Sequence, residues 1–140
     1  MTQKSAGLET TIDIRFKDLD ALGHVNNAVF FTYFEEGRKN FFLKYSSVLK
    51  PSEFGFILAH ISCDYLKPVR LTDRLKLRLI VGAIKNKSFV FHYSLMDRKD
   101  DSVVFARGES IQVCYDYSRN KSVPIPPSLK ERLLLFQEQT

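Results

Sequence analysis

The sequence predicts a single α+β domain in which one long helix packs against an antiparallel sheet. The chain has 140 residues, the size of one domain, and no repeat or long linker divides it. One segment near the start carries apolar residues at helical spacing, and the segments around it alternate between apolar and polar residues. Short turns between consecutive strands favour antiparallel pairing, so we treat residues 1–140 as one domain.

The first strand is expected from Leu8 to Phe16, where apolar and polar residues alternate with the period of a half-buried strand. The alternation stops at Lys17, and a polar segment containing Gly23 follows. This segment is expected to form a loop between the strand and the next element.

A helix is expected from about Asn27 to about Tyr45, capped by Asn26 or Asn27. Its apolar stripe recurs at steps of three and four residues and consists of Phe30, Tyr33, Phe34, Gly37 and Phe41. Gly37 inside a helix costs about 1 kcal/mol relative to Ala. A close approach by a neighbouring strand would explain the glycine.

The rest of the chain is expected to form four strands and a short helix. The strands are expected at Ile57–Val69, Leu75–Val81, Phe89–Met96 and Val103–Tyr117. Beyond a proline-rich break, Ser128 and Glu131 match a capping box for a C-terminal helix that carries Leu129, Leu133 and Leu134.

Charge and aromatic content limit the class of partner. The formal net charge of +5 is too small to establish nucleic-acid binding and suits an anionic small molecule, so we expect no nucleic-acid partner. Twelve Phe and six Tyr are many large apolar side chains for one small core, which favours burial at a subunit interface.

Cysteine, histidine and N-terminal patterns predict a cytoplasmic protein with no metal site. Cys63 and Cys114 form no C-x-x-C pair, which argues against a disulfide scaffold or a zinc site. The three histidines lack metal-ligand spacing. The N-terminus has no apolar signal core, and no run reaches the roughly 18 apolar residues of a membrane span.

The segment from Phe16 to Phe30 carries the residues best suited to chemistry. Asp18 and Asp20 precede the expected helix start, where first-turn N–H groups lack intrahelical acceptors and can hold an oxyanion. A carboxylate on the other side of the same carbonyl would complete a minimal ester- or thioester-hydrolysing site. The alternative is that these residues are turn and cap residues only, which is their commoner use.

Two motifs in this segment resemble the signature of the 4-hydroxybenzoyl-CoA thioesterase family. They are D-L-D-A-L-G-H-V-N-N (residues 18–27) and A-V-F-F-T-Y-F-E-E-G-R (residues 28–38). The similarity continues through S-C-D-Y-L-K-P-V-R-L-T-D (residues 62–73) and K-N-K-S-F (residues 85–89). The resemblance implies a hotdog fold, in which an antiparallel sheet of about five strands wraps around a long central helix.

Carried over by position, the resemblance assigns roles within the loop and the helix start. The catalytic aspartate of the family matches Asp20, and its carbonyl-polarising backbone N–H matches Asn27. His24 is a secondary acid/base candidate, although positioning of the loop is its more natural role. Asp18 matches an acidic position that is not the nucleophile. One hotdog lineage takes its carboxylate from the helix, which makes Glu36 the fallback candidate.

A basic segment is the candidate site for coenzyme A. Lys85, Lys87 and Ser88 fall at the turn where the family binds coenzyme A, which is part of the substrate, so no separate cofactor is expected. Asn86 stands where a cation can occur, and this departure leaves a carrier-protein thioester open as the substrate. The alternating cations around Lys76 would ordinarily be a solvated strand face.

Together these patterns predict an acyl-CoA thioesterase that assembles as a homodimer or homotetramer, with sites at subunit interfaces as in the family. The alternatives are an acyl-carrier-protein thioesterase and a hotdog module that binds acyl groups without turnover.

Overall fold

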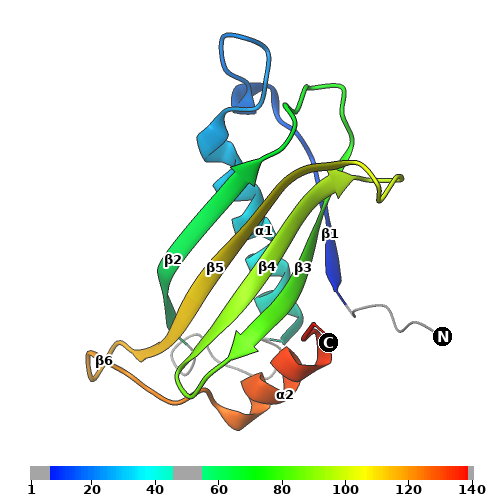
Figure 1. Cartoon of the computed structure of the whole chain (residues 1–140). Helices are drawn as coiled ribbons and strands as arrows, with labels where there is room; N and C mark the ends of the chain where they lie inside the picture. Colours follow the sequence, from blue (N-terminus) through cyan, green and yellow to red (C-terminus); the bar gives the residue numbers. More distant parts are fainter. Residues whose placement is uncertain (1–6, 46–54, 139–140) are drawn as a thin grey trace, which may run out of the picture.

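The computed structural model describes residues 7–45 and 55–138 of the chain, which form one sheet and two helices (Figure 1). The strands are β1 (Leu8–Ile12), β2 (Phe56–Tyr65), β3 (Leu75–Ile84), β4 (Ser88–Asp97), β5 (Val104–Asp116) and β6 (Lys121–Ser122). The helices are α1 (Asn27–Tyr45) and α2 (Pro127–Leu135), and a single 3-10 turn spans Phe16–Asp18.

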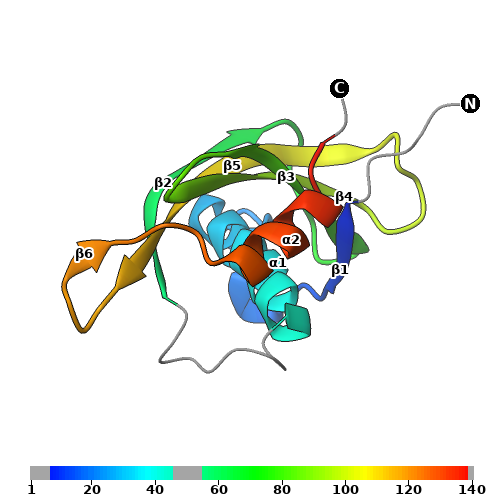
Figure 2. The same cartoon turned by 90° about the horizontal axis from the view of Figure 1, so that it is seen from below.

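The sheet has the order β1-β3-β4-β5-β2, and all of its pairs are antiparallel. Figure 2 shows that it curls over α1, with β1 and β2 on either side of the helix. The short strand β6 pairs with the end of β5. This architecture confirms the expected α+β class and the sheet wrapped around a central helix.

The concave face of the sheet and the apolar stripe of α1 form the core. Phe30, Tyr33, Phe34 and Phe41 are all at most 2% exposed, as the spacing predicted. The Phe34 ring stacks on Tyr93 of β4 at 4.5 Å between centroids. A Cβ at Gly37 would collide with the Leu77 side chain of β3, so the expected close approach is present. No helix in the described part of the chain is long and apolar enough to cross a bilayer.

Two strands end earlier than expected. β1 stops at Ile12, and Phe16 lies in the 3-10 turn with 81% of its surface exposed, because the Asp18 carboxylate accepts the Arg15 N–H. β2 stops at Tyr65 rather than Val69, because the next two N–H groups both donate to the Phe105 carbonyl instead of continuing the ladder.

The C-terminal helix begins without the expected capping box. Pro126 occupies the N-cap position with no side-chain hydrogen bond, and Pro127 fills the first helical position, where proline suits the helix geometry. Leu129 and Leu133 are buried as predicted, whereas Leu134 is 52% exposed. The strand β6 was not predicted.

Candidate active site

Asp18 anchors the loop that leads to α1. Its carboxylate is 1% exposed and accepts hydrogen bonds from the Arg15 N–H and the Tyr33 hydroxyl, both at 2.9 Å, and from Arg15 Nε at 3.1 Å. Burial alone would raise the pKa of Asp18, but the hydrogen bonds from Arg15 and Tyr33 outweigh it and lower that pKa. Asp18 therefore holds the loop in place through hydrogen bonds, which is the role expected for it from the sequence.

Asp20 lies in a tight turn that fixes one of its carboxylate oxygens. Its Oδ1 accepts the Leu22 N–H at 2.9 Å and the His24 N–H at 3.2 Å. Its own N–H donates to the His24 carbonyl at 2.7 Å, and Gly23 closes the turn with a φ of 83°. No donor among the described residues binds Oδ2 of Asp20, so this oxygen is available for chemistry.

A second loop, residues 66–74, holds the Asp20 loop from the side. The Val25 N–H donates to the Val69 carbonyl at 2.8 Å, and His24 forms an antiparallel bridge with Arg70. Val25 and Val69 are both buried, at 3% and 0% exposure. Figure 1 shows the two loops together at the end of the sheet where α1 begins.

The first turn of α1 contains a backbone N–H, that of Asn27, with no acceptor among the described residues. The Asn26 side chain caps the helix by accepting the Ala28 N–H at 2.9 Å, which resolves the choice between Asn26 and Asn27. The N–H of Asn27 has no intrahelical acceptor at this position. No residue within the described ranges accepts it. The Tyr65 hydroxyl of β2 donates to the Asn27 carbonyl at 2.9 Å and so ties the helix start to the sheet.

A pocket of about 410 Å³ joins these elements, and Asp20, His24 and Asn27 all line it. The structure thus brings together the three candidate catalytic residues, whose roles stay predictions. The rest of the lining was not predicted from the sequence as part of the site: Leu22, Val25, Phe30, Tyr65, Leu66, Lys67 and Pro68. The first three lie in the motifs of residues 18–38, and the other four lie in the similar segment of residues 62–73.

The candidate coenzyme A residues lie far from this pocket within one chain. Lys85, Lys87 and Ser88 occupy the turn from β3 to β4, at the opposite end of the sheet from the Asp20 loop (Figure 1). β3 alone separates the two ends by about 30 Å at a rise near 3.3 Å per residue. Among the residues that the structure describes, no carboxylate lies within 4.0 Å of Lys85 or Lys87.

Two cations of β3, Lys76 and Arg78, are neutralised locally. Lys76 pairs with Asp101 at 2.6 Å, and Arg78 pairs with Glu9 at 2.5 Å and with Asp101 at 2.9 Å. Hydrogen bonds from Lys76 and Arg78 lower the pKa of Asp101 to about 2. These residues form an ion-paired face of β3, and their alternation in the sequence had predicted a solvated strand face.

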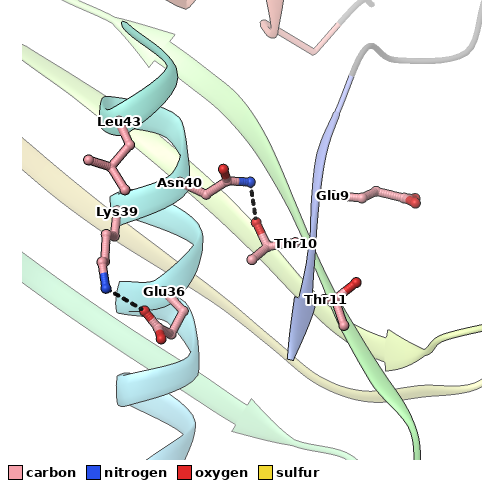
Figure 3. A pocket seen from close by; sticks show the side chains of 7 residues that line it. All are labelled: Glu9, Thr10, Thr11, Glu36, Lys39, Asn40 and Leu43. Carbon is pink, nitrogen blue, oxygen red and sulfur yellow. Dashed lines mark hydrogen bonds and ion pairs between the residues drawn. The ribbon is translucent and has the colours of Figure 1, made fainter. Parts of the chain in front are cut away.

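Glu36, the fallback carboxylate, lies apart from the pocket of Asp20. It lines a shallow hollow of about 270 Å³ between α1 and β1, together with Lys39, Asn40 and Thr10 (Figure 3). Lys39 pairs with Glu36 at 3.8 Å, and the Asn40 side chain donates to Thr10 at 2.8 Å. Neither a candidate oxyanion donor nor Asp20 lines this hollow, so the geometry favours Asp20.

Comparison with known proteins places the chain in a family. The family model described as "Thioesterase-like superfamily" matches residues 14–133. The long-chain acyl-CoA thioesterase FadM of Escherichia coli is 26% identical over 128 residues, covering 90% of this chain and 96% of FadM. The uncharacterized protein YsmA of Bacillus subtilis is 29% identical over 123 residues, covering 88% of this chain and 82% of YsmA.

A solved structure agrees in fold as well as in sequence. A thioesterase of Thermus thermophilus, complexed with coenzyme A and Zn, superimposes with a TM-score of 0.79 at 28% identity, covering 93% of this chain and 98% of the other. The expected hotdog fold and the expected enzyme class, thioester hydrolase, are therefore confirmed. The chain belongs to the thioesterase-like superfamily.

Proposed function

We propose that this protein hydrolyses an acyl-CoA thioester to the free acid and coenzyme A. Asp20 is the nucleophile or the general base, and the Asn27 N–H polarises the thioester carbonyl. The observation that carries the proposal is that Asp20 and Asn27, the first residue of α1, line one pocket. The motifs of residues 18–38 support membership of the narrower 4-hydroxybenzoyl-CoA thioesterase family.

The hydrogen bonds around Asp20 suit either chemical route. Two backbone N–H groups hold Oδ1, which leaves Oδ2 to attack the carbonyl carbon or to take a proton from an attacking water. The carbonyl oxygen gains negative charge in both routes, and the Asn27 N–H at the positive end of α1 stabilises it. One such donor contributes about 3 kcal/mol in comparable sites. The thiolate of coenzyme A leaves as the tetrahedral intermediate breaks down. In the nucleophilic route this step leaves an acyl anhydride on Asp20, which a water molecule then hydrolyses to the free acid.

A dimer would bring the two separated parts of the site together. Lys85, Lys87 and Ser88 cannot reach the pocket of their own chain, because the length of β3 lies between them. β2 is an edge strand of the sheet, so a second copy has an open strand to pair with. In the proposed homodimer or homotetramer, the β3–β4 turn of one subunit binds the nucleotide of the substrate held by the other.

The direct test is thiol release from short, long and aromatic acyl-CoAs, with Asp20→Asn and Glu36→Gln run beside the wild type. We expect Asp20→Asn to lower kcat by about 10²- to 10⁴-fold. Glu36→Gln is the control, a carboxylate on α1 that lies outside the Asp20 pocket, and should keep wild-type turnover. An Asp20→Asn enzyme with wild-type kcat would refute the assignment.

The same panel separates the alternative substrates. Asn86, where the resemblance allows a cation, weakens the expected nucleotide contact and favours a carrier-protein thioester as the second candidate. That candidate predicts little turnover of acyl-CoA, turnover of acyl-carrier protein, and no competition by free coenzyme A. A folded protein inactive on both classes would indicate an acyl-binding module.

A further inference from the structure

Arg38 is a buried cation that has no anionic partner. It lies on α1 and is only 8% exposed, yet its one hydrogen bond is from Nη1 to the neutral Tyr93 hydroxyl at 3.1 Å. Within residues 7–45 and 55–138, no carboxylate comes within 4.0 Å of its guanidinium. A buried charge is costly unless an opposite charge or several acceptors meet it.

The hydrogen-bond network beside Arg38 supplies no negative charge. Tyr93 and Ser110 share a hydrogen bond of 2.5 Å, the Ser110 hydroxyl donates to Gln112 Oε1, and Gln112 Nε2 donates to the Phe89 carbonyl at 3.1 Å. Burial raises the pKa of Tyr93, although Arg38 acts against it, so the phenol stays neutral. The whole chain of buried groups is therefore uncharged apart from the guanidinium.

The unused donors of Arg38 face an open pocket. A guanidinium has five N–H donors. Each guanidinium nitrogen of Arg38 either has a hydrogen-bond partner or is accessible to solvent. Arg38 lines a pocket of about 430 Å³ between α1 and the start of β2, with Phe42, Phe56, Ile57 and Leu58 as apolar walls. The rest of the lining is Glu35, Lys39 and Tyr117. The Phe42 and Phe56 rings stack at 4.8 Å at this end of the α1–β2 side.

This pocket and the Asp20 pocket lie along the same side of the molecule. Both are lined by α1 and β2, which run in opposite directions: the Asp20 pocket meets Asn27 and Tyr65, and the Arg38 pocket meets Phe42 and Phe56. From Asn27 to Arg38 the helix advances about 16 Å at 1.5 Å per residue. An acyl chain held at Asp20 by its thioester would therefore have to extend over about that distance to reach Arg38.

We propose that Arg38 binds a carboxylate at the far end of the acyl group, so that the substrates are thioesters of ω-carboxyl acids. This inference rests on the proposed thioesterase function. A carboxylate matches the planar fork of a guanidinium with two parallel hydrogen bonds and neutralises the buried charge. The apolar walls of the Arg38 pocket suit the last methylene groups of such a chain.

The test compares two series of acyl-CoAs of increasing length, one ending in a methyl group and one in a carboxylate. We expect the wild type to prefer the carboxylate series at the lengths that span the two pockets. In Arg38→Met the ratio of kcat/KM between the two series should fall at least about 10-fold, the effect of losing hydrogen bonds to a charged group. Arg38→Met keeps an apolar stem, and such replacements of buried ions are often tolerated in folding. Lys130→Met, which removes an exposed cation of α2 that lines neither pocket, should leave the ratio unchanged.

A binding measurement separates this inference from the proposed function. Free α,ω-dicarboxylic acids should raise the Tm of the wild type and of Asp20→Asn, but not that of Arg38→Met. That result would support the Arg38 site even if no CoA thioester were hydrolysed. The inference is overturned if dicarboxylates shift no Tm, or if Arg38→Met lowers kcat/KM equally for both series. It is also overturned if Arg38→Met dissociates the oligomer, because a carboxylate of a second copy would then be the missing partner.

Discussion

The Tyr33 hydroxyl donates a 2.9 Å hydrogen bond to the buried Asp18 carboxylate and so joins the first helical turns of α1 to the loop that carries Asp20. Burial and the neighbouring carboxylate raise the pKa of Tyr33, so the phenol remains a donor at all ordinary pH values. The position of Asp20 thus depends on a contact between residues 15 positions apart in the sequence.

Replacing Asp18 with Asn should destabilise the fold and loosen the active loop. The charge-assisted bonds from Arg15 and Tyr33 weaken in a buried site, and we expect a loss of about 2–4 kcal/mol in the free energy of unfolding. Chemical denaturation would measure it. Tyr33→Phe removes one of these bonds and should cost less than Asp18→Asn, and the reverse order would contradict the structure.

The same carboxylate predicts a pH dependence of stability. The pKa of Asp18 is lower in the folded protein than in the unfolded chain, so its contribution is present above the unfolded value of about 3.9. Stability should therefore fall as the pH drops below about 4, through the folded pKa. Denaturation between pH 2 and 7 would show a shallower decline in Asp18→Asn. Equal slopes in both proteins would rule out Asp18 as the responsible group.

Removing the Tyr65 hydroxyl should affect catalysis more than folding. Tyr65→Phe loses the hydrogen bond to the Asn27 carbonyl at a partly exposed site. We expect the free energy of unfolding to fall by about 0.5–1.5 kcal/mol. The Asn27 N–H then loses its fixed position, and kcat should fall several-fold while KM changes little. Steady-state kinetics on the best acyl-CoA would measure this. A rise in KM with unchanged kcat would instead mean that Tyr65 contacts the ground-state substrate only.

Mixed oligomers test whether one site uses two subunits. Asp20→Asn should be nearly inactive, and the double variant Lys85→Glu/Lys87→Glu should have a raised KM for acyl-CoA. If the two parts come from different chains, co-refolding both variants creates hybrid dimers with one intact site and restores low-KM activity. Lys99→Glu, at the opposite end of β4, should leave KM unchanged. Absence of any recovery from verified hybrids would place both parts of the site in one chain.

The backbone at Gly108 lies so close to Ser62 and Phe34 that no side chain fits there. A Cβ there would lie 2.5 Å from both the Ser62 carbonyl oxygen and Cε2 of Phe34. We expect Gly108→Ala to cost about 2–3 kcal/mol, the range for overpacked cores. Thermal and denaturant unfolding would measure it. Because the Ser62 carbonyl remains, Gly108→Ala/Phe34→Leu should still be less stable than Phe34→Leu alone.

Periodicity in the sequence was enough to predict the helix and the order of the strands. The stripe from Phe30 to Phe41 and the alternation of β3 reflect burial on one face, which local pattern records. The end of β1 was missed, because the turn at Phe16 depends on hydrogen bonds to Asp18 that Tyr33 helps to stabilise. The end of β2 was missed, because the Phe105 carbonyl, distant in sequence, diverts its backbone donors.

The candidate site was only partly predictable for a similar reason. Asp20, His24 and Asn27 are close in sequence, and a local motif predicted their grouping. Tyr65 reaches them only because β2 runs antiparallel to α1, which no short pattern encodes. Arg38 looked like one polar residue among several in the helix, and its burial follows from the position of Tyr93 on β4.

The hydrogen bond from the Val25 N–H to the Val69 carbonyl and the bridge between His24 and Arg70 have a practical consequence for engineering. The Asp20 loop and residues 66–74 form one structural unit, because the Val25 N–H of the first segment has its acceptor, the Val69 carbonyl, in the second. Transplanting the catalytic loop of another hotdog protein into this chain would need both segments to be exchanged together. In a library that varies one of these loops and keeps the other constant, we expect most variants to have a distorted Asp20 loop rather than a new specificity.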